Sequence, residues 1–313
     1  MIVESEYDEG LGLFAGRAEG IMGTRLELLC AGVERSVGER VWQEMTDDAA
    51  ALSRMLNRFD PSSEVSRWNA GLSEGNMSAP LQDILSVAED YRARTGGLFD
   101  ICTGTRSLSA RHPAPSSIFS SVLSSSPGPP AVLRRRRLDF GGIAKGYALA
   151  RMEKMLRAEG IGNAFVDFGG SSMLALGHHP HGDCWKISLP DPWTGQILDI
   201  FSLRDCALSV SGNRPGYTGH IINPLTGEHC DCRALVSVIS PDPLEAEILS
   251  TAAFVAGTSS ASESTLAAAT SPAARCQDAP NAPDARTPSL PFLRAAFPTA
   301  RITLHRPGSP ATL

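Results

Sequence analysis

Residues 138–147 read LDFGGIAKGY, and this stretch decides how we interpret the fold. Its apolar start is typical of a strand end and its two glycines of a tight turn. A helix is expected after Lys145, with Ala148, Met152 and Leu156 on one side. A helix that begins directly after a glycine turn offers N–H groups to an anion, and Lys145 adds a positive charge there. The stretch indicates a phosphate site, although glycine also occurs at such junctions for steric reasons alone.

Two further turns of small residues end in or contain glycine. They are FVDFGGS at 165–171 and SVSGN at 209–213, and each follows a predicted strand. Each one alone is typical of an ordinary turn. Three such turns in one chain favour a site that wraps around an extended ligand.

The rest of the pattern mixes helices and strands without a regular βαβ alternation, which predicts an α+β fold. Apolar residues recur at helical spacing over 41–56 and 81–91, and the glycines at 96–97 predict the end of the second helix. Short apolar or β-branched runs flanked by Gly or Pro predict the strands. These runs are 26–29, 164–168, 185–189, 198–203, 235–239 and 301–304.

We predict an N-terminal tail at 1–20 followed by a single domain at 21–313. Two segments, 109–131 and 258–290, are rich in Ser, Pro and Ala and hold few large apolar side chains. Because such segments bury little surface, we expect mobile loops there. The second loop precedes the last predicted strand and is therefore interpreted as an insertion within the domain.

The composition narrows the class of protein. The formal net charge is −6 and the only basic run is 134–137, so no clustered basic face for nucleic acid is expected. The acidic N-terminus lacks the positive charge and apolar core of an export signal. No run of about 18 apolar residues predicts a membrane span. These features predict a cytoplasmic protein.

The cysteines predict neither disulfides nor a zinc site. Their number is odd, seven, and they are scattered without a C-x-x-C pair, which suits a reducing compartment. Cys230 and Cys232 form a lone C-x-C that lacks the second ligand pair of a closed zinc site.

Three polar residues are candidates for chemistry. His220 opens the segment HIINPLTG at 220–227, where it is either a base or a structural histidine bonded to backbone. Glu247 and Thr251 are four residues apart, which places both side chains on one face of a helix. Oxygen ligands of this kind suit magnesium, which keeps substrate phosphates in its coordination shell. The mainly apolar residues around them argue against the alternative of a solvent-exposed helix edge.

Taken in order, these segments resemble the FAD:protein FMN transferase family, also called the ApbE family. The similarity covers residues 22 to about 257, and its most specific blocks are GGIAKGY and HIINPLTG. The matching blocks are 22–24, 63–69, 95–100, 139–147, 169–170, 211–212, 220–227 and 247–251.

The resemblance implies an ApbE-like α+β fold of two interlocked halves with FAD in the cleft between them. It also implies a magnesium-dependent transfer of FMN from FAD to a Thr or Ser hydroxyl of an acceptor protein, with release of AMP. The expected partners are thus FAD and an acceptor flavoprotein that carries a flavinylation motif.

The resemblance also assigns residues to these roles. The metal would be held by the Ala144 carbonyl, Glu247 and Thr251, and His220 would lie beside the reacting phosphate. The residues expected to bind FAD are Met22, Asn69, Asp100, Lys145, Gly169, Gly170 and Ser211. The chain departs from the usual family residues at Glu247, Val210, Cys102 and Ala150, where Asp, Thr, Thr and Asp are common.

Two alternatives stay open at this point. A degraded metal site would leave a protein that binds FAD without turning it over. Attack by water in place of an acceptor hydroxyl would make the protein an FAD pyrophosphatase that yields FMN and AMP.

Overall fold

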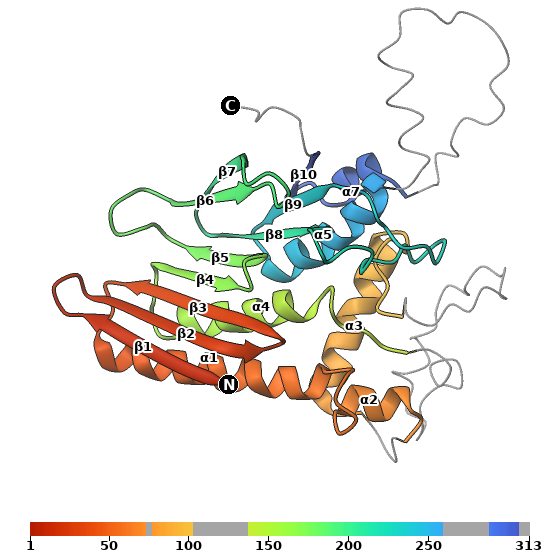
Figure 1. The fold of residues 1–313 in the computed structure, drawn as a ribbon. Helices are drawn as coiled ribbons and strands as arrows, with labels where there is room; N and C mark the ends of the chain where they lie inside the picture. The colour runs from red at the N-terminus through yellow and green to blue at the C-terminus, as the bar shows by residue number, and fades with distance from the viewer. Residues whose placement is uncertain (73–76, 103–136, 259–287, 307–313) are drawn as a thin grey trace, which may run out of the picture.

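The computed structural model describes residues 1–72, 77–102, 137–258 and 288–306 (Figure 1). Within these ranges, one eight-stranded sheet carries the fold, and every neighbouring pair of its strands is antiparallel. In spatial order the strands are β1 (Ile2–Asp8), β2 (Leu13–Ile21), β3 (Thr24–Ala31), β4 (Ala164–Phe168), β5 (Ser172–Leu176), β8 (Cys206–Gly212), β9 (Leu235–Ser240) and β10 (Arg301–His305).

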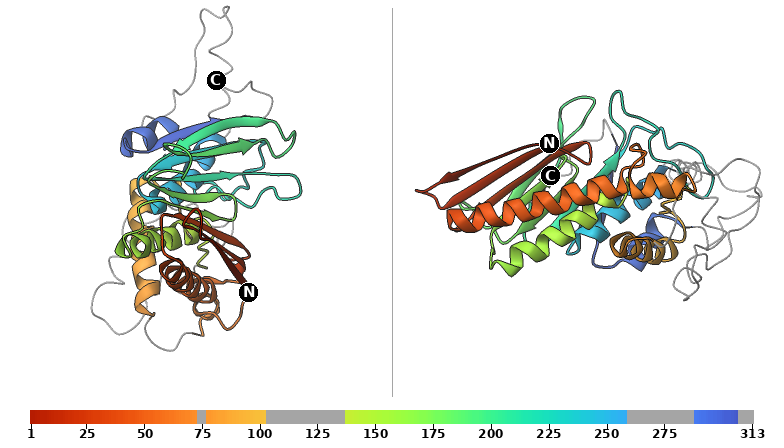
Figure 2. Two further views of the ribbon diagram at one scale, coloured as in Figure 1. Left: turned by 90° about the vertical axis from the view of Figure 1, so that its left-hand side faces the viewer. Right: turned by 90° about the horizontal axis from the view of Figure 1, so that it is seen from below.

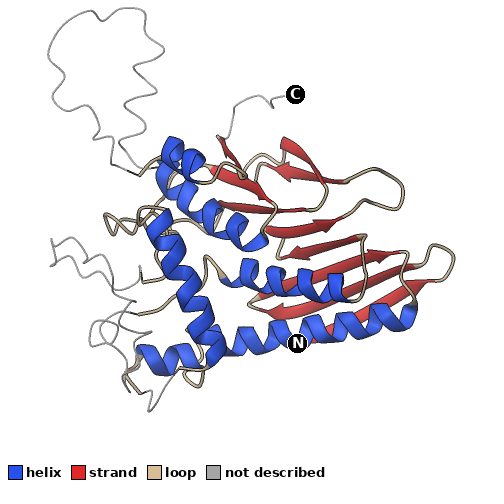
Figure 3. Cartoon of the chain, turned by 180° about the vertical axis from the view of Figure 1, so that it is seen from behind, coloured by secondary structure: helices blue, strands red, loops and turns tan. Residues whose placement is uncertain are grey.

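Helices cover one face of this sheet (Figure 3). The helices of the described ranges are α1 (Arg35–Leu56), α2 (Glu64–Asn69), α3 (Ala79–Arg94), α4 (Ala144–Ala158), α5 (Pro243–Thr258) and α7 (Leu290–Ala296). The long helix α1 runs along the sheet beside α4, whereas α2 and α3 lie beyond one end of the strands (Figures 1 and 2). The α+β fold predicted from the sequence is confirmed.

The opposite face is covered only in part. A two-stranded sheet of β6 (Trp185–Pro190) and β7 (Ile197–Leu203) packs there against β5, β8 and β9. The outer face of β1–β3 carries mainly charged side chains. None of the helices in the described ranges combines the length and apolar character that a bilayer span requires.

The apolar residues that recur at helical spacing over 41–56 and 81–91 form the buried faces of α1 and α3. On α1, Val41, Met45, Ala49 and Leu52 are buried against β2 and β3. The mainly apolar α5 is buried on almost every side, which explains its poor amphipathic pattern. A second hydrophobic core, separate from the one between α1 and strands β2 and β3, surrounds α5. This helix packs there against β8 and β9.

The six strands predicted from the sequence are all present, with ends shifted by two residues or fewer. The tail predicted at 1–20 is wrong, because these residues form β1 and most of β2, paired from Ile2↔Glu19 to Asp8↔Leu13. Alternating charged residues hide this edge strand from an apolar-run criterion. The loop predicted at 109–131 lies outside the described residues. So does the loop at 258–290, except for Thr258 at the end of α5 and residues 288–290.

Candidate active site

The site is built where α4 begins against the first turns of α5. Gly146 permits this approach, because a Cβ placed there would lie 2.4 Å from the Glu247 Cβ and 2.9 Å from the Pro243 carbonyl oxygen. Carbon atoms in contact are normally 3.5–4.0 Å apart, so a larger residue would force the helices to separate. Gly146 therefore brings its neighbour Lys145 directly beside Glu247.

The Glu247 carboxylate is buried and fully engaged. Only 3% of the residue is exposed, and one carboxylate oxygen, Oε1, accepts from the Lys145 ammonium. The other oxygen, Oε2, accepts from the hydroxyls of Ser172 and Ser209, the latter at 2.8 Å. The negative charge of this buried carboxylate is thus matched by one ammonium and two hydroxyl donors.

A chain of hydroxyl groups connects Glu247 to Thr251. Ser209 Oγ lies 3.0 Å from Ser250 Oγ, which lies 2.7 Å from Ser211 Oγ. Ser211 Oγ in turn lies 3.4 Å from Thr251 Oγ1. The structure thus connects Glu247, Ser211 and Thr251 through neighbouring hydroxyl groups.

Sequence reasoning missed Ser172, Ser209 and Ser250 as parts of this site. Ser172 follows the glycine turn at 165–171, and Ser209 opens the segment 209–213, so both lie within or beside motifs that the sequence had singled out. Only the pairing Ser172↔Ser209 between β5 and β8 shows that they face the same carboxylate.

These residues fit a hard divalent cation. Glu247 and Thr251 offer oxygen donors one helical turn apart, which is the donor type that magnesium prefers. The Lys145 ammonium already occupies Glu247 and acts there as a stand-in cation. Gly142 places the turn before α4 next to Thr251, since its Cβ would lie 3.3 Å from Thr251 Oγ1. Ala144 is buried, and in the sequence it lies between Gly142, which contacts Thr251, and Gly146, which contacts Glu247.

His220 lies at the surface near the same helix start. Its ring stacks on Tyr217 with centroids 4.2 Å apart, and the Arg214 guanidinium lies 5.1 Å from the Tyr217 centroid. Partial burial of the ring, followed by the charges of Arg214 and Lys145, lowers the pKa of His220 below its ordinary value. This direction favours the neutral ring, the form in which a histidine accepts a proton.

Three residues predicted to bind FAD lie in two neighbouring turns. Met22 is in the turn between β2 and β3, and Gly169 and Gly170 are in the turn between β4 and β5. Gly169 has a φ of 73°, and its Cβ would lie 2.8 Å from Thr24 Oγ1, so only glycine fits without strain. Gly170 also has a positive φ and donates its N–H to Asp167. Met22 occupies the neighbouring β2–β3 turn, where its N–H donates to Ser53 Oγ at 3.0 Å.

Asn69 and Asp100 bond to the protein's own backbone. The Asn69 amide donates to the Leu138 carbonyl at 3.0 Å and accepts from the Leu138 N–H at 2.7 Å. Asp100 accepts from the Cys102 N–H at 2.8 Å. Asn69 therefore holds the segment that leads into the GGIAKGY turn, and Asp100 holds the segment that follows α3.

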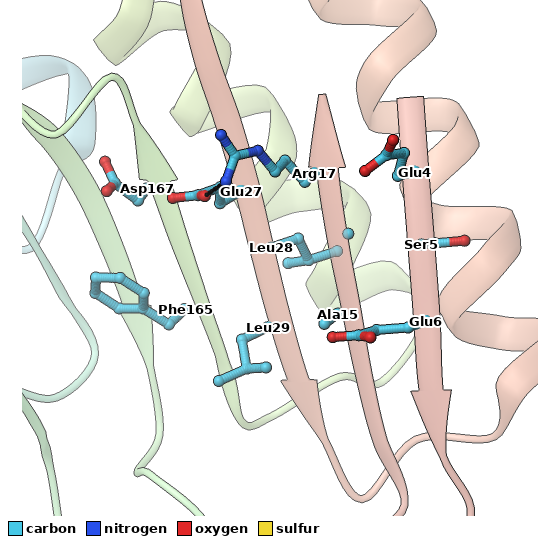
Figure 4. A pocket seen from close by; sticks show the side chains of 11 residues that line it. Glu4, Ser5, Glu6, Ala15, Arg17, Glu27, Leu28, Leu29, Phe165 and Asp167 are labelled. Carbon is cyan, nitrogen blue, oxygen red and sulfur yellow. Dashed lines mark ion pairs between the residues drawn. The ribbon is translucent and has the colours of Figure 1, made fainter. Parts of the chain in front are cut away.

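A surface depression elsewhere on the molecule is unsuited to a dinucleotide. It has a volume of about 510 Å³ and lies on the outer face of β1–β4, and none of the predicted site residues lines it (Figure 4). Its charged lining residues are Glu4, Glu6, Glu27, Asp167 and Arg17. Because Arg17 already pairs with Glu27 at 3.4 Å, the carboxylates would repel a diphosphate.

Metal sites built from His, Cys, Asp and Glu alone are not found in the described ranges. No three such side chains lie close enough together to hold a metal ion there. The six cysteines described, Cys230 and Cys232 among them, are free thiols.

Comparison with known proteins decides the family. The profile of the ApbE family matches residues 22–272, which is most of the chain. The chain belongs to the ApbE family. The resemblance seen in its sequence blocks is thus confirmed, and the Glu247–Thr251 and Lys145 region falls within the matched residues.

Curated ApbE-type relatives match parts of the chain. A protein of Treponema pallidum is 36% identical over 141 residues, which cover 39% of this chain and 38% of that protein. A protein of Rhodobacter capsulatus is 27% identical over 273 residues, which cover 76% of this chain and 50% of that protein. Both are named FAD:protein FMN transferase. The match thus spans at most half the length of these relatives.

Solved ApbE structures share the fold. The apo form of Pseudomonas stutzeri flavinyl transferase ApbE superposes with a TM-score of 0.60 at 23% identity, covering 81% of this chain and 85% of that one. The Thermotoga maritima ApbE protein gives a TM-score of 0.62 at 22% identity, covering 81% and 90%. At this identity the comparison establishes the ApbE-like fold that the sequence predicted.

Proposed function

We propose that this ApbE-family protein transfers FMN from FAD to a Thr or Ser hydroxyl of an acceptor protein, in a magnesium-dependent reaction that releases AMP. One observation carries the proposal. The Glu247 carboxylate and the Thr251 hydroxyl converge with the start of α4 in a chain that matches the ApbE family over residues 22–272. The names of the curated relatives support the same activity.

The cation would be held by Glu247, Thr251 and the Ala144 carbonyl. When bound, it would neutralise charge on the FAD diphosphate, which is the main requirement of phosphoryl-type transfer. The protein's own contribution is positioning. The positive end of the α4 dipole and the Lys145 ammonium would attract the diphosphate, and the turns that hold Met22 and Gly169 would line the flavin side.

His220 would accept the proton of the attacking hydroxyl at a ring nitrogen. The hydroxyl oxygen would form a bond to the phosphorus on the FMN side of the diphosphate. The bond from that phosphorus to the bridging oxygen would break, and AMP would leave with the electron pair. A half-buried imidazole whose pKa is lowered by this burial and by the charges of Arg214 and Lys145 is suited to this role.

The test combines three products in one assay. Purified protein is incubated with FAD, magnesium and an acceptor that carries a flavinylation motif, and AMP, free FMN and protein-bound flavin are followed. AMP together with covalent flavin supports the transferase. AMP with free FMN would instead show a pyrophosphatase, and bound FAD without either product would show a flavin-binding protein.

Substitution of Glu247 supplies the residue-level test. Glu247→Ala is expected to abolish magnesium-dependent transfer while FAD binding persists. Glu245→Ala is the matched control, because Glu245 is also a buried carboxylate of α5 but bonds to Ser240 at 2.8 Å, away from the site. Turnover by Glu247→Ala at the rate of Glu245→Ala would contradict the metal assignment. His220→Ala is expected to lower turnover by about a hundredfold or more.

A further inference from the structure

Lys145 occupies the position from which a cation would approach Glu247. The Glu247 side chain is only 4% exposed, whereas that of Lys145 is 21% exposed. The ammonium therefore lies between the buried carboxylate and the outside of the protein. Its long stem leaves the first turn of α4, so the charged end can move without any change in the helix.

The carboxylate itself is fixed. Its Oε2 accepts from Ser172 and Ser209, and Ser209 is held in turn by Ser250. Rotation of the carboxylate would break these bonds in a buried site, where an unsatisfied hydroxyl is costly. An arriving cation therefore meets Oε1, the oxygen that Lys145 already holds. An ammonium and a divalent cation on the same oxygen repel each other strongly.

Formal charges show which combinations of ligands the site favours. Lys145 and Glu247 cancel each other when nothing else is bound. A divalent cation and a dinucleotide diphosphate, with two negative charges, also cancel each other. Binding of either ligand alone would leave two uncompensated charges, while binding of both leaves the site neutral again.

We infer that Lys145 is an exchangeable counter-ion, bound to Glu247 in the empty site and transferred to the substrate diphosphate when the divalent cation takes Glu247. This inference rests on the proposed function for the identity of the dinucleotide, but its competition step concerns the cation alone. The exchange makes the two ligands bind cooperatively. By linkage, each ligand raises the affinity for the other by the same factor, typically about 5- to 150-fold.

The experiment measures Mn²⁺ affinity of the full chain by electron paramagnetic resonance, with and without FAD. Lys145→Met removes the competing charge and keeps the length of the stem. We expect it to bind Mn²⁺ about tenfold more tightly than the wild type without FAD, and to bind FAD more weakly when Mn²⁺ is present. Lys154→Met, an exposed lysine of the same helix, is the control and should leave both affinities unchanged.

A second variant guards against misfolding. Lys145→Gln is neutral but can still donate a hydrogen bond to Glu247, so the buried carboxylate keeps a partner. It should also tighten Mn²⁺ binding in the absence of FAD, and circular dichroism checks that both variants are folded. Equal or weaker Mn²⁺ binding in folded Lys145→Gln would overturn the inference.

The outcomes for the two proposals are separable. Tighter Mn²⁺ binding in both variants, in a protein that transfers no flavin, would support the counter-ion exchange and refute the transfer activity. Flavin transfer by the wild type with unchanged Mn²⁺ affinity in the variants would refute the exchange alone.

Discussion

The contact at Gly146 gives a quantitative prediction for Gly146→Ala. The added methyl group would lie 2.4 Å from the Glu247 Cβ and 2.9 Å from the Pro243 carbonyl oxygen. Neither atom can rotate away, so α4 and α5 would have to separate by about 1 Å to restore contacts of about 3.5–4.0 Å. Overpacking of this kind costs about 1–3 kcal/mol. Alanine returns up to about 1 kcal/mol as a better helix former than glycine.

The net expectation is a loss of about 1–2 kcal/mol, which corresponds to a fall in Tm of about 1.5–3 °C in a protein of 313 residues. Differential scanning calorimetry measures the shift. Gly162→Ala is the control, since a Cβ there meets nothing within 4 Å. A Tm at or above that of the wild type would refute the close packing of α4 on α5.

Two further predictions follow from single contacts. Asn69→Asp keeps the acceptor for the Leu138 N–H but loses the donor to the buried Leu138 carbonyl, so chemical denaturation should show a loss of about 1–3 kcal/mol. Asn57→Asp should be close to neutral by comparison, because Asn57 only accepts, from the Phe59 N–H. Arg214→Gln removes a positive charge near His220, so the pKa of His220 should rise towards its ordinary value. An NMR titration of the ring measures this, and the acid limb of turnover should move to higher pH; a fall in the pKa would contradict the assignment.

Part of the site could be predicted from the sequence because its geometry is local. Glu247 and Thr251 share a helix face by spacing alone, and Lys145 starts a helix after a glycine turn. The partners of Glu247 could not be predicted, because Ser172 and Ser209 meet it only through strand pairing and helix packing. Glu247 has a longer side chain than the aspartate usual in the family, and its Oε2 reaches the hydroxyls of Ser172 and Ser209.

The sequence by itself determined the α+β class, the core faces of the main helices and the family, since periodicity and ordered motifs are properties of neighbouring residues. It did not reveal that 2–8 forms an edge strand, because this run alternates charged residues and gains its place through backbone hydrogen bonds to β2. Tertiary structure also decided that Asn69 clamps Leu138, 69 residues away, and that Lys145 neutralises Glu247, 102 residues away. Contacts at such separations depend on how the whole chain packs, because no local preference links the two partners.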